Sequence, residues 1–163
     1  MEKDIIRLIY DRLERNLLLL MALPLPVFAV IYLQAGKDGF DQPSLAIFGA
    51  NFLLALALFL LGLQYFNFQR RINQIRLLDV PLETRMEKYE KAIMARYWVL
   101  FIITWISGLG LYLFENQLFS VVFALTLIAF SLGKAMPRRI VKQLRLKGEE
   151  KERVEALSKR VAL

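Results

Sequence analysis

The chain has 163 residues, of which 57% are hydrophobic, and its 22 Lys and Arg residues against 15 Asp and Glu give a formal net charge of +7. It contains no Cys and no His, which excludes disulfide frameworks, thiolate chemistry and Cys-based zinc sites, and removes the usual metal ligand and near-neutral general base. Because almost all basic residues lie outside long apolar segments, the positive excess indicates anionic lipid headgroups as partners and argues against nucleic acid.

Four apolar segments determine the fold class. They contain no charged residue and are residues 16–36, 42–69, 97–114 and 116–133. A helix that crosses a hydrocarbon core of about 30 Å needs roughly 17–25 mostly apolar residues. We therefore predict an all-α integral membrane protein with four transmembrane helices, arranged as two hairpins with cytoplasmic helical extensions.

The N-terminal segment 2–15 carries charges of both signs and is expected to form an amphipathic helix. Its apolar residues fall on one helical face, so the helix either lies in the membrane interface or continues into the first span. The apolar run that follows is longer than the 7–15 residues of a signal-peptide core, so we expect it to remain as the first span. The residues of the apolar face are Ile5, Ile6, Ile9 and Leu13.

Two features of the first hairpin are candidate sites. Pro24 and Pro26 predict a kink or break within 23–27, because proline removes a helix hydrogen bond and clashes with the preceding turn. The kink is either a packing feature or a hinge that lines a cavity. Asn51 places an amide within the second span, where it either bonds to another helix or contacts a substrate or ion.

The second span is expected to continue beyond the membrane as one helix, because Phe68, Ile72 and Ile75 keep a single apolar face. Pro81 then suits the start of a helix over 82–96, which should lead directly into the third span. Three carboxylates on one face of this helix could hold a divalent cation, although neighbouring basic residues favour an ordinary solvated surface. These acids are Glu83, Glu87 and Glu90.

The third and fourth spans should form a tight hairpin around residues 115–117. Ser107, Gly108 and Gly110 form a small-residue patch in the third span that permits close helix approach. Directly after the fourth span comes the densest basic cluster of the chain. It either contacts anionic lipid at about 1 kcal/mol per residue or acts only as a topological anchor. Its members are Arg138, Arg139, Lys142, Arg145 and Lys147.

The distribution of Lys and Arg predicts the orientation. Seven lie in 70–96, ten from residue 134 onward and four before residue 16, whereas the connection 35–44 has one and the turn 115–117 has none. Under the positive-inside rule both termini and the central loop are cytoplasmic. Without an organellar targeting signal, this compact multi-pass architecture fits a bacterial inner membrane.

The halves 1–80 and 81–163 together form one expected membrane domain, and they resemble each other. An internal parallel repeat is one of two explanations for this similarity. The sequence Arg-Arg-Ile follows the second span at 70–72 and the fourth at 138–140. Basic residues after each span also follow from the positive-inside rule alone, so duplication and coincidence both stay open.

The leading functional hypothesis is a non-enzymatic membrane protein that acts by protein or lipid interaction, as a scaffold, accessory or regulatory subunit. The chain lacks a Gly-rich phosphate loop and a nucleophile elbow, so we expect no catalytic residue, metal or cofactor. The apolar stripes beyond the spans, including one at Val154, Leu157 and Val161, are covered by a membrane or cytoplasmic protein, by a second copy, or by each other.

Two other hypotheses remain. A small transporter or channel would have a path near Pro24, Pro26 and Asn51. A lipid-modifying enzyme would use Glu83 and Glu87 on the cytoplasmic side.

Overall fold

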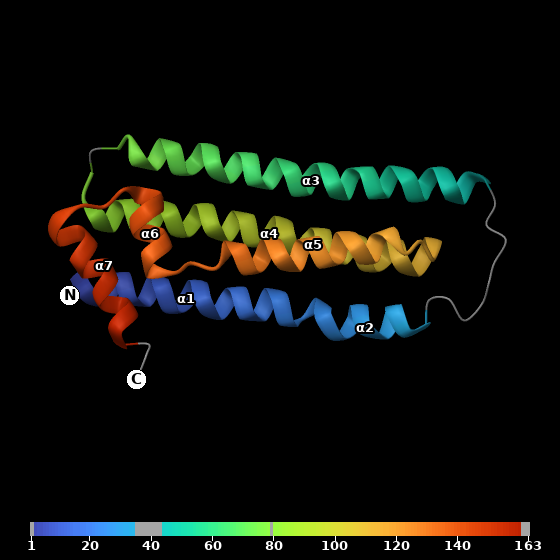
Figure 1. Ribbon diagram of the computed structural model, residues 1–163, viewed down its shortest axis with the longest axis horizontal. Coiled ribbons are helices and arrows are strands. Elements are labelled where there is room, and N and C mark those ends of the chain that lie inside the picture. The colour runs from blue at the N-terminus through green and yellow to red at the C-terminus, as the bar shows by residue number, and fades with distance from the viewer. Residues whose placement is uncertain (1, 35–43, 79, 161–163) are drawn as a thin grey trace.

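The computed structural model describes residues 2–34, 44–78 and 80–160, which form seven helices and no strand. The long helices lie side by side and antiparallel, and the two short helices α6 and α7 lie across one end (Figure 1). We name this end, which also holds the start of α1, the basic end, and the opposite end, where α4 turns into α5, the turn end. The helices are α1 (Glu2–Ala22), α2 (Pro24–Gln34), α3 (Ser44–Arg76), α4 (Leu82–Phe114), α5 (Leu118–Gly133), α6 (Pro137–Leu144) and α7 (Gly148–Arg160).

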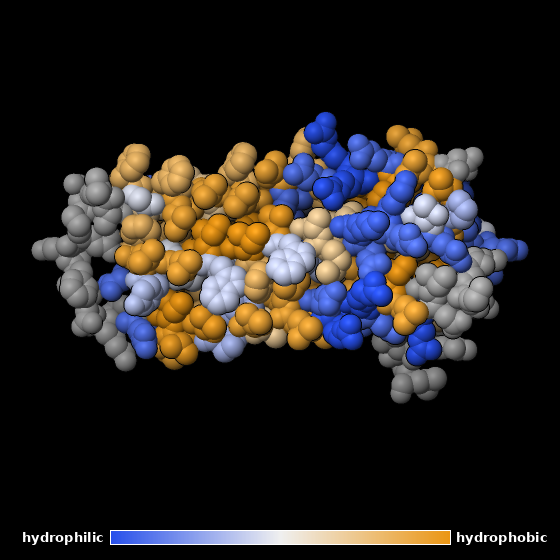
Figure 2. Space-filling view, turned by 180° about the vertical axis from the view of Figure 1, so that it is seen from behind, coloured by the Kyte–Doolittle hydropathy of each residue, from blue (hydrophilic) through white to orange (hydrophobic). Residues whose placement is uncertain are grey.

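Several helices are long and apolar enough to be compatible with a membrane location. Three candidate spans qualify. They are Ile6–Gln34, which takes α1 and α2 together, Ile47–Arg76 in α3, and Leu82–Phe114, which is α4. A fourth candidate exists only if α5 and α6 count together as one span, across a bend of 81°. Figure 2 shows apolar side chains over the part of the surface toward the turn end and hydrophilic side chains gathered toward the basic end.

Helix α4 is the central element, since it packs against α1, α2, α3 and α5. We compare the most apolar 18-residue stretch of each candidate span. In α4, 44% of these residues are buried, against 11% in Ile6–Gln34 and 17% in Ile47–Arg76. The outer helices therefore present most of their apolar surface outward, as lipid-facing helices do. Tyr97, Leu100 and Ile103 on α4 are fully buried at the centre of the core.

The N-terminal amphipathic helix is confirmed, and it continues into the first apolar segment. Ile6, Ile9 and Leu13 are only 3%, 5% and 0% exposed, and α1 runs without a break to Ala22. Ile5 lies outside the described side chains. The chain then breaks at Leu23, within the predicted region, and α2 starts at Pro24.

Helix α3 continues beyond its apolar part to Arg76, as predicted. Its apolar stripe at Phe68, Ile72 and Ile75 is buried inside the chain, and so is Val154 on α7. Leu157 and Val161 lie outside the described side chains. These stripes were expected to be covered by a partner protein, by a second copy or within the same chain. For the residues that it describes, the structure shows them covered within the same chain.

The fourth apolar segment differs from the prediction. Helix α5 begins after the predicted turn at 115–117, but its 16 residues give a length of only about 24 Å before the chain bends. The residue before Pro137, Met136, is extended (φ −98, ψ 141), because proline disfavours a helical conformation in the preceding residue. The Tyr97 hydroxyl donates to the Gly133 carbonyl oxygen at 3.1 Å, which satisfies one acceptor at the helix end.

The exits from the two hairpins also differ. Helix α3 leaves its apolar part in a straight line, whereas the chain after α5 breaks and turns by 81° into α6. The described structure therefore does not confirm an internal repeat.

Candidate functional site: a basic pocket

A cavity of about 600 Å³ lies between α3, α4, α5 and α6. It forms because α5 ends early and α6 turns away, while α3 continues to Arg76 and leaves space beside them. We name it the basic pocket. It is lined by Leu61, Gln64, Tyr65, Phe68, Gln69 and Arg76 of α3, Arg96 of α4, Ala129 and Leu132 of α5, and Arg139, Lys142 and Gln143 of α6.

Arg96 is the most enclosed cation of the pocket. Its guanidinium carbon lies 5.0 Å from the centroid of the Phe68 ring, a cation–π arrangement, and its Nη2 donates to the Ala129 carbonyl at 3.3 Å. Its Nε is buried and has no hydrogen-bond partner within the described chain. Thus one donor of a partly desolvated cation needs an acceptor that the described residues do not supply.

Three further cations line the same pocket. Arg139 donates to the Leu132 carbonyl, and Arg76 donates to the Gln143 carbonyl and, at 3.1 Å, to Oδ1 of Asn73. Lys142 is exposed in the last turn of α6.

The pocket has no acid to balance these cations. Its lining contains no Asp or Glu, and none of its four cations forms an ion pair with a carboxylate among the described residues. Four cations around one cavity repel one another, and an anion bound between them relieves this repulsion. The electrostatics of the pocket therefore favour an anionic ligand.

Gln64 adds an unmatched acceptor on the side of the pocket away from the basic end. The residue is 6% exposed, and its Oε1 is buried with no hydrogen-bond partner in the described chain. It precedes Phe68 by one helical turn, which places it about 6 Å farther from the basic end. The pocket lining also includes the apolar residues Leu61, Ala129 and Leu132, so the surroundings of Gln64 are largely apolar.

Helix α6 is joined to α4 by a side-chain hydrogen bond. The hydroxyl of Tyr89, which is 1% exposed, donates to Oε1 of Gln143 at 2.7 Å. On the other side of the pocket, Gln143 accepts from Arg76 through its backbone carbonyl. Gln143 thus joins α3, α4 and α6 and positions one wall of the pocket.

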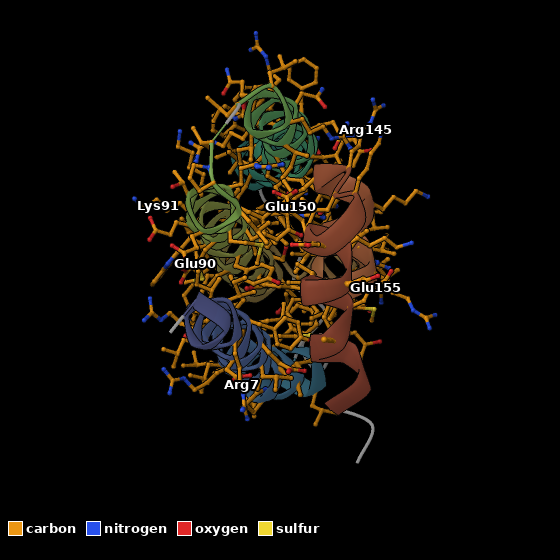
Figure 3. All side chains as sticks on the ribbon, turned by 90° about the vertical axis from the view of Figure 1, so that its left-hand side faces the viewer. Arg7, Glu90, Lys91, Arg145, Glu150 and Glu155 are labelled. Carbon is orange, nitrogen blue, oxygen red and sulfur yellow. The ribbon has the colours of Figure 1, made fainter. Side chains whose placement is uncertain are left out.

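Helix α7 is joined to α4 at the basic end. The Arg85 Nη2 lies 2.7 Å from Oε1 of Glu150, and Figure 3 shows Glu150 directed from α7 toward the interior of the molecule. A second pair, Lys134 with Glu14 at 2.8 Å, ties the break after α5 to α1. These pairs, together with the contacts of α7 to α6 and α1, hold the short helices in place.

The predicted basic cluster divides between the pocket and the outer surface. Arg139 and Lys142 line the pocket, whereas Arg138, Arg145 and Lys147 are exposed and do not. Figure 3 shows Arg145 at the periphery of the basic end.

The sequence predicted only Arg139 and Lys142 among the pocket residues, and it did not single out Arg76, Arg96, Gln64 or Gln143. Arg96 did give a signal, because it is the charged residue that directly precedes the third apolar segment.

The other predicted site residues do not meet. Pro24 is buried and Pro26 exposed on α2, which packs on α1 and α4, whereas Asn51 is exposed on α3. No hydrogen bond of the Asn51 side chain occurs within the described residues. None of these three residues lines the basic pocket.

The acidic face of α4 is not arranged around a common point. Glu90 pairs with Arg12 of α1 at 3.3 Å, and Glu87 is exposed. In the part of the chain that the structure describes, no group of three or more acidic residues could hold a metal ion.

Comparisons with protein-family models, curated protein sequences and solved structures find no match to this chain.

Proposed function

We propose that this protein is a multi-pass inner-membrane protein that acts without catalysis by binding the headgroup of an anionic phospholipid in the basic pocket. The observation that carries the proposal is the set of four cationic side chains around one cavity whose lining contains no carboxylate. Basic pockets between membrane helices on the cytoplasmic side are typical sites for anionic headgroups.

The position of the pocket supports a lipid ligand. It lies where α5 ends, and its lining changes from Leu61 and Leu132 to the cations Arg139 and Lys142. With the basic end in the cytoplasm, as the positive-inside rule predicts, this change coincides with the level of the headgroups. An acyl chain can then remain beside the apolar part of α3 and α5 while the phosphate enters the pocket.

The chemistry of Arg96 supports a phosphate in particular. A guanidinium presents several donors in a planar fork that matches phosphate oxygens, and its unpartnered Nε still needs an acceptor. Burial of that donor without a partner costs about 1–3 kcal/mol, so a phosphate oxygen that accepts from it would gain affinity.

Binding to phospholipid nanodiscs of defined composition tests the proposal. We expect the purified protein to retain phosphatidylglycerol over phosphatidylcholine in native mass spectrometry, and we expect Arg96→Gln and Arg139→Gln each to lower this selectivity about five- to tenfold. Arg138→Gln is the matched control, because Arg138 carries the same charge next to Arg139 but is exposed outside the pocket.

Two outcomes would contradict the proposal. One is equal retention of phosphatidylglycerol and phosphatidylcholine by the unchanged protein. The other is an equal loss in Arg138→Gln and Arg139→Gln, which would assign the basic residues to topology alone.

The remaining hypotheses stay predictions without a specific supporting contact. A scaffold or accessory role toward a protein partner is compatible with lipid binding, but the apolar stripe of α3 that could have received a partner is covered within the chain. The transport hypothesis gains no support from the basic pocket, because its lining does not include Pro24, Pro26 or Asn51.

A further inference from the structure

The pocket makes two complementary demands on its ligand. The buried Nε of Arg96 needs an acceptor, and the buried Oε1 of Gln64 needs a donor. A phosphate diester supplies acceptors only. A ligand that satisfies both atoms must therefore combine an anionic acceptor with a nearby hydroxyl or N–H group.

The order of the residues along α3 gives the ligand a direction. Gln64 lies one turn, about 6 Å, farther from the basic end than Phe68, whose ring faces the Arg96 guanidinium. Arg76 lies eight residues, about 12 Å, beyond Phe68 toward the basic end. From the apolar side outward, the ligand therefore meets first the Gln64 acceptor, then the Arg96 cation and finally Arg76.

A lipid that enters with its chain toward Leu61 places its glycerol between chain and phosphate, at the level of Gln64. In a diacyl lipid both glycerol oxygens on that side are esterified, so they offer acceptors and leave Oε1 of Gln64 without a donor. In a single-chain lipid one of these oxygens is a free hydroxyl that can donate to Oε1 while the phosphate accepts from Arg96.

Building on the proposed function, we infer that the preferred ligand is a single-chain anionic phospholipid, such as a lysophosphatidic acid, whose free glycerol hydroxyl donates to Gln64. Arg96 and Arg139 bind its phosphate, and Lys142 and Arg76 neutralise the remaining negative charge. Gln64 is then the residue that distinguishes single-chain from diacyl lipids.

The test uses two probes with the same charge and the same chain, in nanodiscs of phosphatidylcholine. One is 1-acyl lysophosphatidic acid and the other is its 2-O-methyl derivative, in which the hydroxyl is capped. We expect the unchanged protein to bind the free-hydroxyl probe about tenfold more tightly, because capping leaves the buried acceptor unpaired. In Gln64→Leu this preference should disappear while both probes still bind more tightly than phosphatidylcholine.

Gln74→Leu is the matched control, because Gln74 is exposed on the same helix and does not line the pocket. It should keep the preference. Thermal unfolding of each variant shows whether the fold is retained. If Gln64→Leu does not fold, the comparison of the two probes on the unchanged protein still decides the question.

Water-soluble sn-glycerol 3-phosphate separates a lipid from a free phosphate ester, since it has the phosphate and the hydroxyl but no chain. We expect millimolar glycerol phosphate to leave lipid binding unchanged, and full displacement would overturn the assignment to a lipid. Equal binding of the free and capped probes would overturn the role of Gln64. The proposed function would survive that result if Arg96→Gln still lowered the affinity of the protein for both probes. It would fail if neither probe bound more tightly than phosphatidylcholine.

Discussion

At Gly110, α4 and α5 approach so closely that an added Cβ would overlap the ring of Phe119. That ring is fully buried and stacks on Phe114 with centroids 6.3 Å apart, so it cannot move aside without disturbing the hairpin. We expect Gly110→Ala to destabilise the protein by about 1–3 kcal/mol, the usual cost of overpacking a core. Thermal or denaturant unfolding in mild detergent measures the effect.

Gly62 provides the control for this prediction. It also lies within a long apolar helix, but an added Cβ there would meet no atom within 4 Å. Gly62→Ala should therefore be neutral or stabilising by up to about 1 kcal/mol through helix propensity. If the two substitutions changed stability equally, the close approach at Gly110 would not limit packing.

At the scale of the secondary-structure elements, the hydrogen bond between Tyr89 and Gln143 joins α6 to α4. Tyr89→Phe removes the donor to Oε1 of Gln143 and leaves the ring in place. We expect a loss of about 1 kcal/mol and faster amide hydrogen exchange in residues 137–144 than in the unchanged protein. Tyr112→Phe, at an exposed tyrosine of the same helix α4, should change neither quantity. Unchanged exchange in Tyr89→Phe would show that α6 is held mainly by its apolar side chains.

The elements that could be predicted from the sequence are those set by local periodicity. The spacing of Phe68, Ile72 and Ile75 gives the continuation of α3, and Pro81 gives the start of α4, because both are properties of neighbouring residues. The bend before Pro137 was missed because charge-free residues alone do not show where a helix turns. The pocket could not be predicted, because Gln64, Arg96 and Arg139 come from three helices and meet only through tertiary packing.

At the scale of the whole molecule, the main structural question is whether α5 completes a fourth crossing. Its 16 residues give about 24 Å, less than a hydrocarbon core of about 30 Å. The three residues 134–136 run on toward the basic end (Figure 1) and add up to about 10 Å if extended. The segment from Leu118 to Met136 is therefore long enough to cross, and the even number of crossings would place both termini on one side.

Because the chain has no Cys, single-cysteine variants can test this topology without background labelling. We expect a membrane-impermeant maleimide to label Asn116→Cys only from the periplasmic face, and Lys88→Cys and Arg145→Cys only from the cytoplasmic face. Leu100→Cys, at a fully buried position of α4, should remain unlabelled from both faces. Labelling of Arg145→Cys from the same face as Asn116→Cys would show that α5 does not cross the membrane. The basic pocket would then not lie at the cytoplasmic headgroups, as the proposed function requires. Each of these three variants could also be labelled only from the face opposite to the expected one. That result would still agree with four crossings, but the orientation predicted from the basic residues would be wrong.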